Sequence, residues 1–359
     1  MLNRNVVLKN IAAPGWALMN AFILLVLVLS QAVHAQSGTW QRIDLNNKAS
    51  LRGSAVYQNS LWVTGSNNTV FVSQDAGKTW HDRSVSAEIT TDFRDIALFD
   101  HNHAIVMGAG TGPQSVLYQT LDAGKTWQRL LLNAAKSGFF NAIAFWDKNT
   151  GLLLGDPVDG YYVIKKTQDG GKTWRRIALD KLPTIADNEA AFAASGNTLI
   201  TGANGQAWLT TGGFAASVYY SNDWGESWRR QAVPLFRATA TAGGYALALN
   251  QRQQVFVLGG DYQQRAQQYQ NIAVYAQQQW QPVDAGLRGL RTAMACNNSV
   301  CIISGRTGSD ISFDQGQHWQ AFDDASAAKT QAGFYTLASS EHVILAAGEQ
   351  GKVALYVNE

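Results

Sequence analysis

Arginines that could bind a carboxylate recur at one position of a predicted strand pattern. Arg52, Arg94 and Arg291 each follow a bulky apolar residue where a short apolar strand is expected to begin. Asn141 and Tyr335 take the same position in two further strands. A guanidinium can donate two parallel hydrogen bonds to one carboxylate. The pattern therefore predicts a polar pocket that recognises a carboxylate or a peptide.

Side chains in the segments that follow other predicted strands could supply a second chemistry. These residues are Asp156, Asp159, Glu189, Asp261, Tyr262, Arg265, Arg306 and Asp310. Two carboxylates facing each other across a cleft can hydrolyse a glycosidic bond. The simpler alternative is that the arginines pair with these acids and with Asp95 and only fill a wet channel. The sequence leaves both alternatives open.

An eight-residue phrase defines the elements that must position these side chains. Ser/Thr-x-Asp-x-Gly-x-x-Trp occurs five times, at 73–80, 120–127, 167–174, 221–228 and 312–319. Recurrence every 20–50 residues indicates a solenoid or a propeller. The Asp can accept hydrogen bonds from its own turn, and the Gly allows a positive φ. The Trp is expected to start a strand and to bury its ring between neighbouring sheets.

Two more tryptophans extend this series to seven. Trp40 and Trp280 lie at the expected spacing without the full phrase. Seven tryptophans predict an all-β fold, a seven-bladed β-propeller with four strands per blade. Residues 39–43 are expected to add the outer strand to the blade formed by residues 334–357, which would close the ring. We expect one propeller domain over residues 36–359.

The strand order predicts where a site would lie. All the Asp phrases would join third to fourth strands on one face. The opposite face would carry the long connections 155–161, 202–217, 259–271 and 305–310. In the fourth blade, the innermost strand is expected around Ala190 and the second strand is expected to end at Gly202. Long loops on a rigid scaffold commonly carry binding sites, so the site is expected on this second face.

Residues 1–35 have the pattern of a secretory signal peptide. Arg4 and Lys9 precede an apolar run at 22–29, and Val33-His34-Ala35 has the small-x-small form of a cleavage site. The run is shorter than the ~20 residues that a membrane-spanning helix needs. These features predict a periplasmic or secreted protein without a membrane span after cleavage, and an uncleaved anchor is the alternative.

Charge and cysteine content restrict the partners further. The chain has 28 Lys and Arg side chains and 26 Asp and Glu side chains. Because Arg4 and Lys9 lie in the predicted signal, the rest of the chain has equal numbers of positive and negative side chains, which argues against nucleic-acid binding.

Cys296 and Cys301 flank a predicted turn and favour a disulfide in an oxidising compartment; the alternative is two buried thiols that face opposite sides. No metal or cofactor site is expected, since the glycines at 108–112 lack dinucleotide-binding spacing.

The repeated phrase is similar to the Asp-box, or BNR repeat, of sialidases, sortilin-type receptors, some xyloglucanases and photosystem II assembly factors. Five further stretches resemble secreted bacterial propellers that are similar to photosystem II stability and assembly factors: DFRDI at 92–96, AFWD at 144–147, GDPVDG at 155–160, EAAFAASG at 189–196 and GGDY at 259–262. This resemblance implies a non-enzymatic protein that binds an exported protein or peptide. The Arg-Ile-Pro motif of sialidases is missing, so no catalytic residue is carried over. A glycoside hydrolase and a carbohydrate-binding module are the alternatives.

Overall fold

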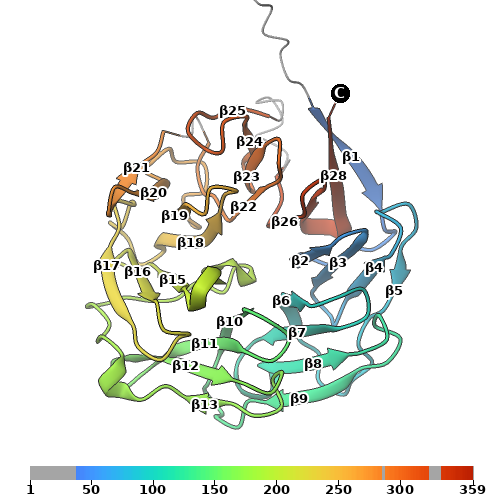
Figure 1. The fold of residues 1–359 in the computed structure, drawn as a ribbon, viewed down its shortest axis with the longest axis horizontal. Coiled ribbons are helices and arrows are strands. Elements are labelled where there is room, and N and C mark those ends of the chain that lie inside the picture. Colours follow the sequence, from blue (N-terminus) through green and yellow to red (C-terminus); the bar gives the residue numbers. More distant parts are fainter. Residues whose placement is uncertain (1–37, 285–287, 323–332, 359) are drawn as a thin grey trace, which may run out of the picture. The chain divides into compact units, whose positions relative to one another are not determined.

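The computed structural model describes residues 38–284, 288–322 and 333–358. Residues 38–357 form seven four-stranded antiparallel sheets, arranged around a ring as the blades of a propeller (Figure 1). The fold prediction is therefore confirmed. The predicted signal peptide at 1–35 lies outside the described residues. Across the described ranges, no helix has the length and apolar character to cross a membrane.

The blades follow one another along the chain, with the innermost strand first. Blade 1 consists of β2 (Leu51–Tyr57), β3 (Ser60–Gly65), β4 (Val70–Ser73) and β5 (His81–Asp82). Blade 2 consists of β6 (Asp92–Leu98), β7 (Ala104–Ala109), β8 (Val116–Thr120) and β9 (Gln128–Leu132). Blade 3 consists of β10 (Phe140–Phe145), β11 (Gly151–Val158), β12 (Tyr161–Thr167) and β13 (Arg175–Arg176).

Blade 4 consists of β14 (Leu199–Thr201), β15 (Ala207–Thr211), β16 (Ser217–Ser221) and β17 (Arg229–Ala232). Blade 5 consists of β18 (Ala242–Leu249), β19 (Val255–Asp261), β20 (Ile272–Ala276) and β21 (Gln279–Pro282). Blade 6 consists of β22 (Ala293–Cys296), β23 (Cys301–Gly305), β24 (Gly308–Ser312) and β25 (Gln320–Ala321). Blade 7 consists of β26 (Thr336–Ser339), β27 (Ile344–Ala347), β28 (Lys352–Asn358) and β1 (Gly38–Asp44).

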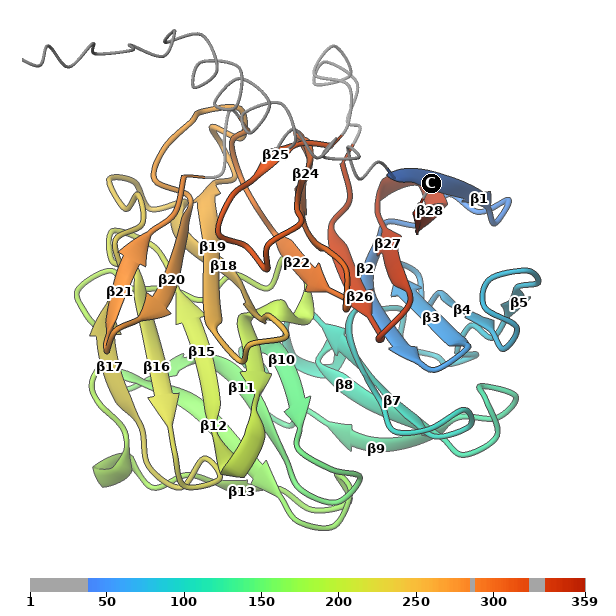
Figure 2. The same ribbon diagram turned by 45° about the horizontal axis from the view of Figure 1, so that its top comes forward.

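The first described strand closes the ring. Blade 7 has the order β1-β28-β27-β26, so the N-terminal strand pairs with the last strand of the chain (Figure 2). Trp40 of β1 packs edge-on against Phe322 and Phe334, with ring centroids 5.3 and 5.0 Å away. The predicted pairing of residues 39–43 with the last blade is confirmed.

The Asp phrases form the predicted turns. Asp122 accepts hydrogen bonds from the backbone N–H of Thr126 at 2.8 Å and from its hydroxyl at 2.6 Å. Thr120 donates to the same carboxylate at 2.8 Å, and Gly124 has a φ of 79°. The hydrogen bonds from Thr126, ahead of the one from Thr120, lower the pKa of Asp122 to about 2. These carboxylates are therefore occupied in holding the turns.

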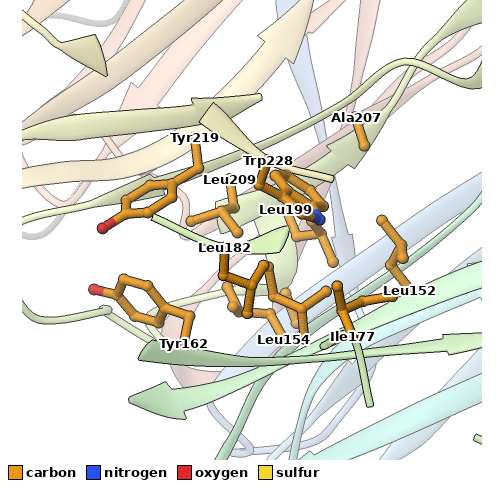
Figure 3. Packing of buried hydrophobic residues seen from close by; sticks show 12 residues of the cluster. Leu152, Leu154, Tyr162, Ile177, Leu182, Leu199, Ala207, Leu209, Tyr219 and Trp228 are labelled. Atoms are coloured by element: carbon orange, nitrogen blue, oxygen red, sulfur yellow. The ribbon is translucent and has the colours of Figure 1, made fainter. Parts of the chain in front are cut away.

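The tryptophans that follow the turns pack between neighbouring blades, as predicted. Trp228 is 5% exposed and belongs to a cluster that joins blade 3 to blade 4 (Figure 3). Leu152 and Leu154 supply the blade 3 side of this cluster, and Leu209 lies on the blade 4 side. Burial of aromatic and aliphatic side chains is the main favourable contribution to the packing between sheets.

Blade 4 departs from the prediction. Residues 199–201 form its innermost strand rather than its second, and the second strand is β15, inside the expected connection 202–217. Ala190 makes only an isolated bridge to Gly212. The prediction was wrong because residues 189–198, defined here as the cross-channel segment, leave the sheet.

Two other expected long connections are short. Strands β11 and β12 continue through most of 155–161 and turn at Asp159-Gly160. Strands β23 and β24 are joined by only Arg306-Thr307. The connection after β19 is long, as expected, and runs from Tyr262 to Asn271.

Candidate functional site

A pocket of about 370 Å³ lies at the centre of the ring, on the face opposite the Asp phrases. Six of the blades line the pocket with residues of the innermost strand, residues just before that strand or residues near the connection between second and third strands. At blade 4, the cross-channel segment lines the pocket instead. Its lining residues are Arg52, Arg94, Phe139, Asn141, Asp156, Ala191, Phe192, Ala193, Ala194, Tyr245, Tyr262, Arg265, Leu290, Thr292, Arg306 and Tyr335.

Two arginines of this pocket are held by backbone carbonyls. Arg52 Nη1 donates to the carbonyl oxygen of Ala194 at 2.8 Å, and Arg94 Nη1 donates to that of Ala193 at 2.6 Å. The Arg52 guanidinium also lies 4.8 Å from the ring centroid of Tyr335. Burial, followed by repulsion from Arg94, lowers the pKa of Arg52 from its usual value. Both arginines are thus oriented by neutral carbonyl oxygens.

The charge of the pocket is positive. Four arginines line it, and Asp156 is the one carboxylate among the described lining residues. Arg94 forms an ion pair with Asp92 at 3.3 Å, and Arg306 forms one with Glu349 at 2.9 Å. Among the described residues, neither Arg52 nor Arg265 forms an ion pair with a carboxylate. An anionic ligand would therefore be attracted to this site.

Asp156 is held by a side chain of the same blade. Asn141 donates a hydrogen bond to its carboxylate at 2.8 Å. Burial raises the pKa of Asp156 above its usual value, and the hydrogen bond from Asn141 opposes this rise only in part.

The cross-channel segment forms the floor of the pocket. Its short 3-10 turn, η3 (Gly196–Thr198), lies against the innermost strands of blades 2, 3 and 5. Asn197 donates to the carbonyl of Thr292 at 3.2 Å, which ties the segment to blade 6. Together with the bonds from Arg52 and Arg94, this contact joins the segment to blades on several sides of the ring.

Glu189 anchors the start of this segment. Its side chain is fully buried and accepts hydrogen bonds from Tyr219 at 2.8 Å, from the Ala186 N–H at 2.7 Å and from Thr211. Arg230 lies 3.3 Å away. The buried carboxylate is thus paired and satisfied, and burial together with Glu189 raises the pKa of Tyr219. Glu189 is a structural anchor beside the pocket and does not line it.

The structure divides the predicted site residues into two groups. Arg52, Arg94, Asn141, Asp156 and Tyr262 line the pocket together. The other five do not: Asp159, Glu189, Asp261, Arg291 and Asp310. These five were expected at the channel mouth, and they lie outside the lining of this pocket.

Local partners explain why these other residues are turned away. Arg291 is 1% exposed and forms an ion pair with Asp310, which Arg288 also contacts at 3.2 Å. Burial would raise the pKa of Asp261, but hydrogen bonds from Thr241 and Thr239 lower it below its usual value. Asp159 is an exposed turn residue with a φ of 55°.

Aromatic and apolar lining residues were missed by sequence reasoning. Phe192 stacks on Tyr245 with ring centroids 4.5 Å apart and meets Tyr262 edge-on at 6.2 Å. Phe139 and Leu290 also line the pocket. Only the unusual run of small residues around Phe192 could have indicated a segment that leaves its sheet.

A disulfide joins Cys296 and Cys301 in the structure, with the sulfur atoms 2.02 Å apart. The two cysteines are directly opposed in β22 and β23 of blade 6. They lie away from the pocket lining, so this bond bears on the hairpin of blade 6. Across the described ranges, no group of three or more His, Cys, Asp and Glu side chains is arranged to hold a metal ion.

The Asp-box turns, the seven blades and the arginine-lined central pocket define the class of protein. The chain is a seven-bladed propeller whose turns carry the Asp-box (BNR) phrase, and it resembles the photosystem II assembly factors. Residues 26–112 match the family described as photosynthesis system II assembly factor YCF48. No curated protein matches the chain by sequence.

Solved structures of the same fold come from binding proteins and from enzymes. "YCF48 bound to D1 peptide" aligns with 92% of this chain and 100% of its own, at 17% identity and a TM-score of 0.66. YCF48 from Cyanidioschyzon merolae aligns over 88% and 98%, at 17% identity and a TM-score of 0.64. A GH74 xyloglucanase from Xanthomonas campestris aligns over 88% of this chain and 53% of its own, at 15% identity and a TM-score of 0.62. The TM-scores show a shared fold, and at these identities the likeness extends to the fold alone.

Proposed function

We propose that this propeller is a non-enzymatic assembly or stability factor that binds an exported protein or peptide in its central pocket. The observation that carries the proposal is Arg52, which the neutral Ala194 carbonyl orients and which forms no ion pair among the described residues, with the positive Arg94 beside it. Such guanidinium groups are suited to acidic groups of a partner. The likeness to a propeller described as bound to a peptide supports the same reading.

The predicted signal peptide is the basis for placing this function in the periplasm or outside the cell. A partner in that compartment would itself be exported. The hydrolase alternative needs two facing carboxylates, and the described lining residues include only Asp156. This composition favours binding over glycoside hydrolysis.

The test is a crosslinking pull-down of the tagged protein from its own cells, read by mass spectrometry. We expect the wild type to capture a specific exported protein. The amount of that protein captured by the Arg52→Ala/Arg94→Ala variant should be at least tenfold lower. The matched control is Arg129→Ala/Arg229→Ala, which removes two exposed arginines of outer strands. Equal capture by all three proteins would reject the pocket as the binding site.

A further inference from the structure

The pocket has two chemically unlike halves on opposite sides of the ring. Arg52 and Arg94 come from the innermost strands of blades 1 and 2. Tyr245 and Tyr262 come from blade 5, which faces blades 1 and 2 across a seven-membered ring. Arg265 lines the pocket from the same connection as Tyr262, and its Nε donates to the Tyr262 carbonyl at 2.8 Å. Phe192 joins the aromatic half from the cross-channel segment. A ligand that fills both halves must carry two different groups.

The arginine half of the pocket has N–H donors that can still bind a ligand. A guanidinium has five N–H donors, and one nitrogen of Arg52 is engaged by the Ala194 carbonyl. Arg94 Nη2 is paired with Asp92 at 3.3 Å, so Arg52 is the guanidinium of this half without an ion pair among the described residues. Its remaining N–H groups, with the positive charge of Arg94 beside them, are suited to a carboxylate of the ligand.

The aromatic half offers a surface for a large apolar side chain. Phe192 and Tyr245 are stacked at an interplanar angle of 15°, and Leu290 lies in the same lining. The floor between the two halves is formed by alanines at 191, 193 and 194, whose small side chains leave room for a ligand backbone.

Exposed apolar side chains continue this surface outside the pocket. Phe214 is 53% exposed in the connection between β15 and β16, and Val158 is 44% exposed at the end of β11. Both belong to the face that carries the pocket. Phe214 follows Gly212 by two residues, and Gly212 is packed against the Phe192 ring. Single exposed apolar residues are ordinary, but their position next to the pocket fits a peptide that continues past its rim.

We infer that the pocket selects a peptide in which a carboxylate lies next to a large apolar side chain. The carboxylate binds Arg52 and Arg94, and the apolar side chain packs against Phe192, Tyr245 and Tyr262. This inference rests on the proposed function and specifies its ligand. The carboxylate can be the end of a chain or the side chain of Asp or Glu, which share the same chemistry.

Fluorescence anisotropy with four labelled synthetic peptides tests the inference. The first ends in glycine-phenylalanine with a free carboxylate; the second is its amide. The third has serine in place of phenylalanine, and the fourth is amidated and carries an internal aspartate-phenylalanine pair. We expect the first peptide to bind at least tenfold tighter than the second and the third. Tight binding of the fourth would identify a side-chain carboxylate as sufficient, and weak binding would identify the chain end.

Two variants assign the preference to the aromatic half. Tyr262→Ala and Phe192→Ala should each weaken binding of the phenylalanine peptide towards that of the serine peptide, leaving the serine peptide unchanged. Tyr262 is 42% exposed, so its replacement keeps the fold even if the Phe192 variant does not. Leu121→Ala, at an exposed position of an Asp turn, is the control. Equal binding of the phenylalanine and serine peptides by the wild type would overturn the inference.

A random peptide library separates failure of this inference from failure of the proposed function. The library should display both free chain ends and internal segments. If the enriched peptides bind only when Arg52 and Arg94 are present but share no acidic-apolar pair, the proposed ligand preference is wrong and the proposed peptide-binding function stands. Failure of the library to enrich any peptide that depends on these arginines would count against both.

Discussion

At the scale of single residues, Asp95 links two blades beneath the cross-channel segment. Its carboxylate accepts hydrogen bonds from the Ile143 N–H of blade 3 at 2.7 Å and from the Ile96 N–H at 2.8 Å. Gly196 packs directly against it. Burial raises the pKa of Asp95 from 3.8 to about 7, because the two N–H groups offset only part of the lost hydration. The side chain borders the channel, but its carboxylate is enclosed.

This raised pKa predicts a pH dependence of stability. Between pH 4 and pH 7, the folded state holds a proton on Asp95 that the unfolded state has lost, so its contribution to stability falls as pH rises. Asp95→Asn should remove this contribution, and the difference in urea midpoint between wild type and variant should change across pH 4–7. Asp159→Asn, at an exposed turn, is the control. A constant difference between wild type and Asp95→Asn over that range would contradict the assignment.

At the scale of elements, the cross-channel segment takes residues that could have extended the innermost strand of blade 4 and forms the floor of the pocket with them. Blade 4 keeps only three residues of innermost strand, whereas β18 of blade 5 has eight. The residues lost from the sheet supply Phe192 and the carbonyls that orient two arginines. An irregular segment inside a regular scaffold is thus the element that shapes the site.

Gly196→Ala tests the fit of this segment. A methyl group at this position would lie 1.8 Å from the Asp95 carboxyl carbon, so either the segment or Asp95 must move. Overpacking of this kind costs about 1–3 kcal/mol, and we expect a lower urea midpoint with an unchanged slope. Gly348→Ala is the matched control, since the nearest heavy atom to its new methyl would be 3.4 Å away. Equal midpoints for the two variants would show that the segment yields without cost.

The cross-channel segment also separates the features that could be predicted from the sequence from those that could not. The Asp turns and the tryptophans are local signals repeated in register, so the blade count and the ring closure could be predicted. Arg52 and Arg94 line the pocket together because each lies at the irregular position of its innermost strand, where the register shifts at the same place in both blades. That Arg291 lies outside this lining could not be predicted, because its partner Asp310 is close only in space. The path of residues 189–198 depends on contacts around the ring, which strand periodicity does not encode.

At the scale of the whole molecule, closure of the ring depends on two distant parts of the chain. Strands β1 and β28 bring residues near 40 and near 355 into one sheet. Closing so long a loop costs entropy, which side-chain packing across the joint must offset. Trp40 is the largest side chain at this joint, and its ring meets Phe322, Phe334 and Tyr356.

Trp40→Ala should therefore destabilise the whole ring. A fully buried aromatic costs about 3–5 kcal/mol on replacement by Ala, and Trp40 is half-buried, so we expect about 2 kcal/mol. The free energy of unfolding should fall in a single transition seen equally by far-ultraviolet circular dichroism and by tryptophan fluorescence. Trp224→Ala, which removes a 43% exposed ring from a turn, should cost less. If Trp40→Ala instead produced an early transition confined to part of the signal, blade 7 would open alone, and ring closure would not govern global stability.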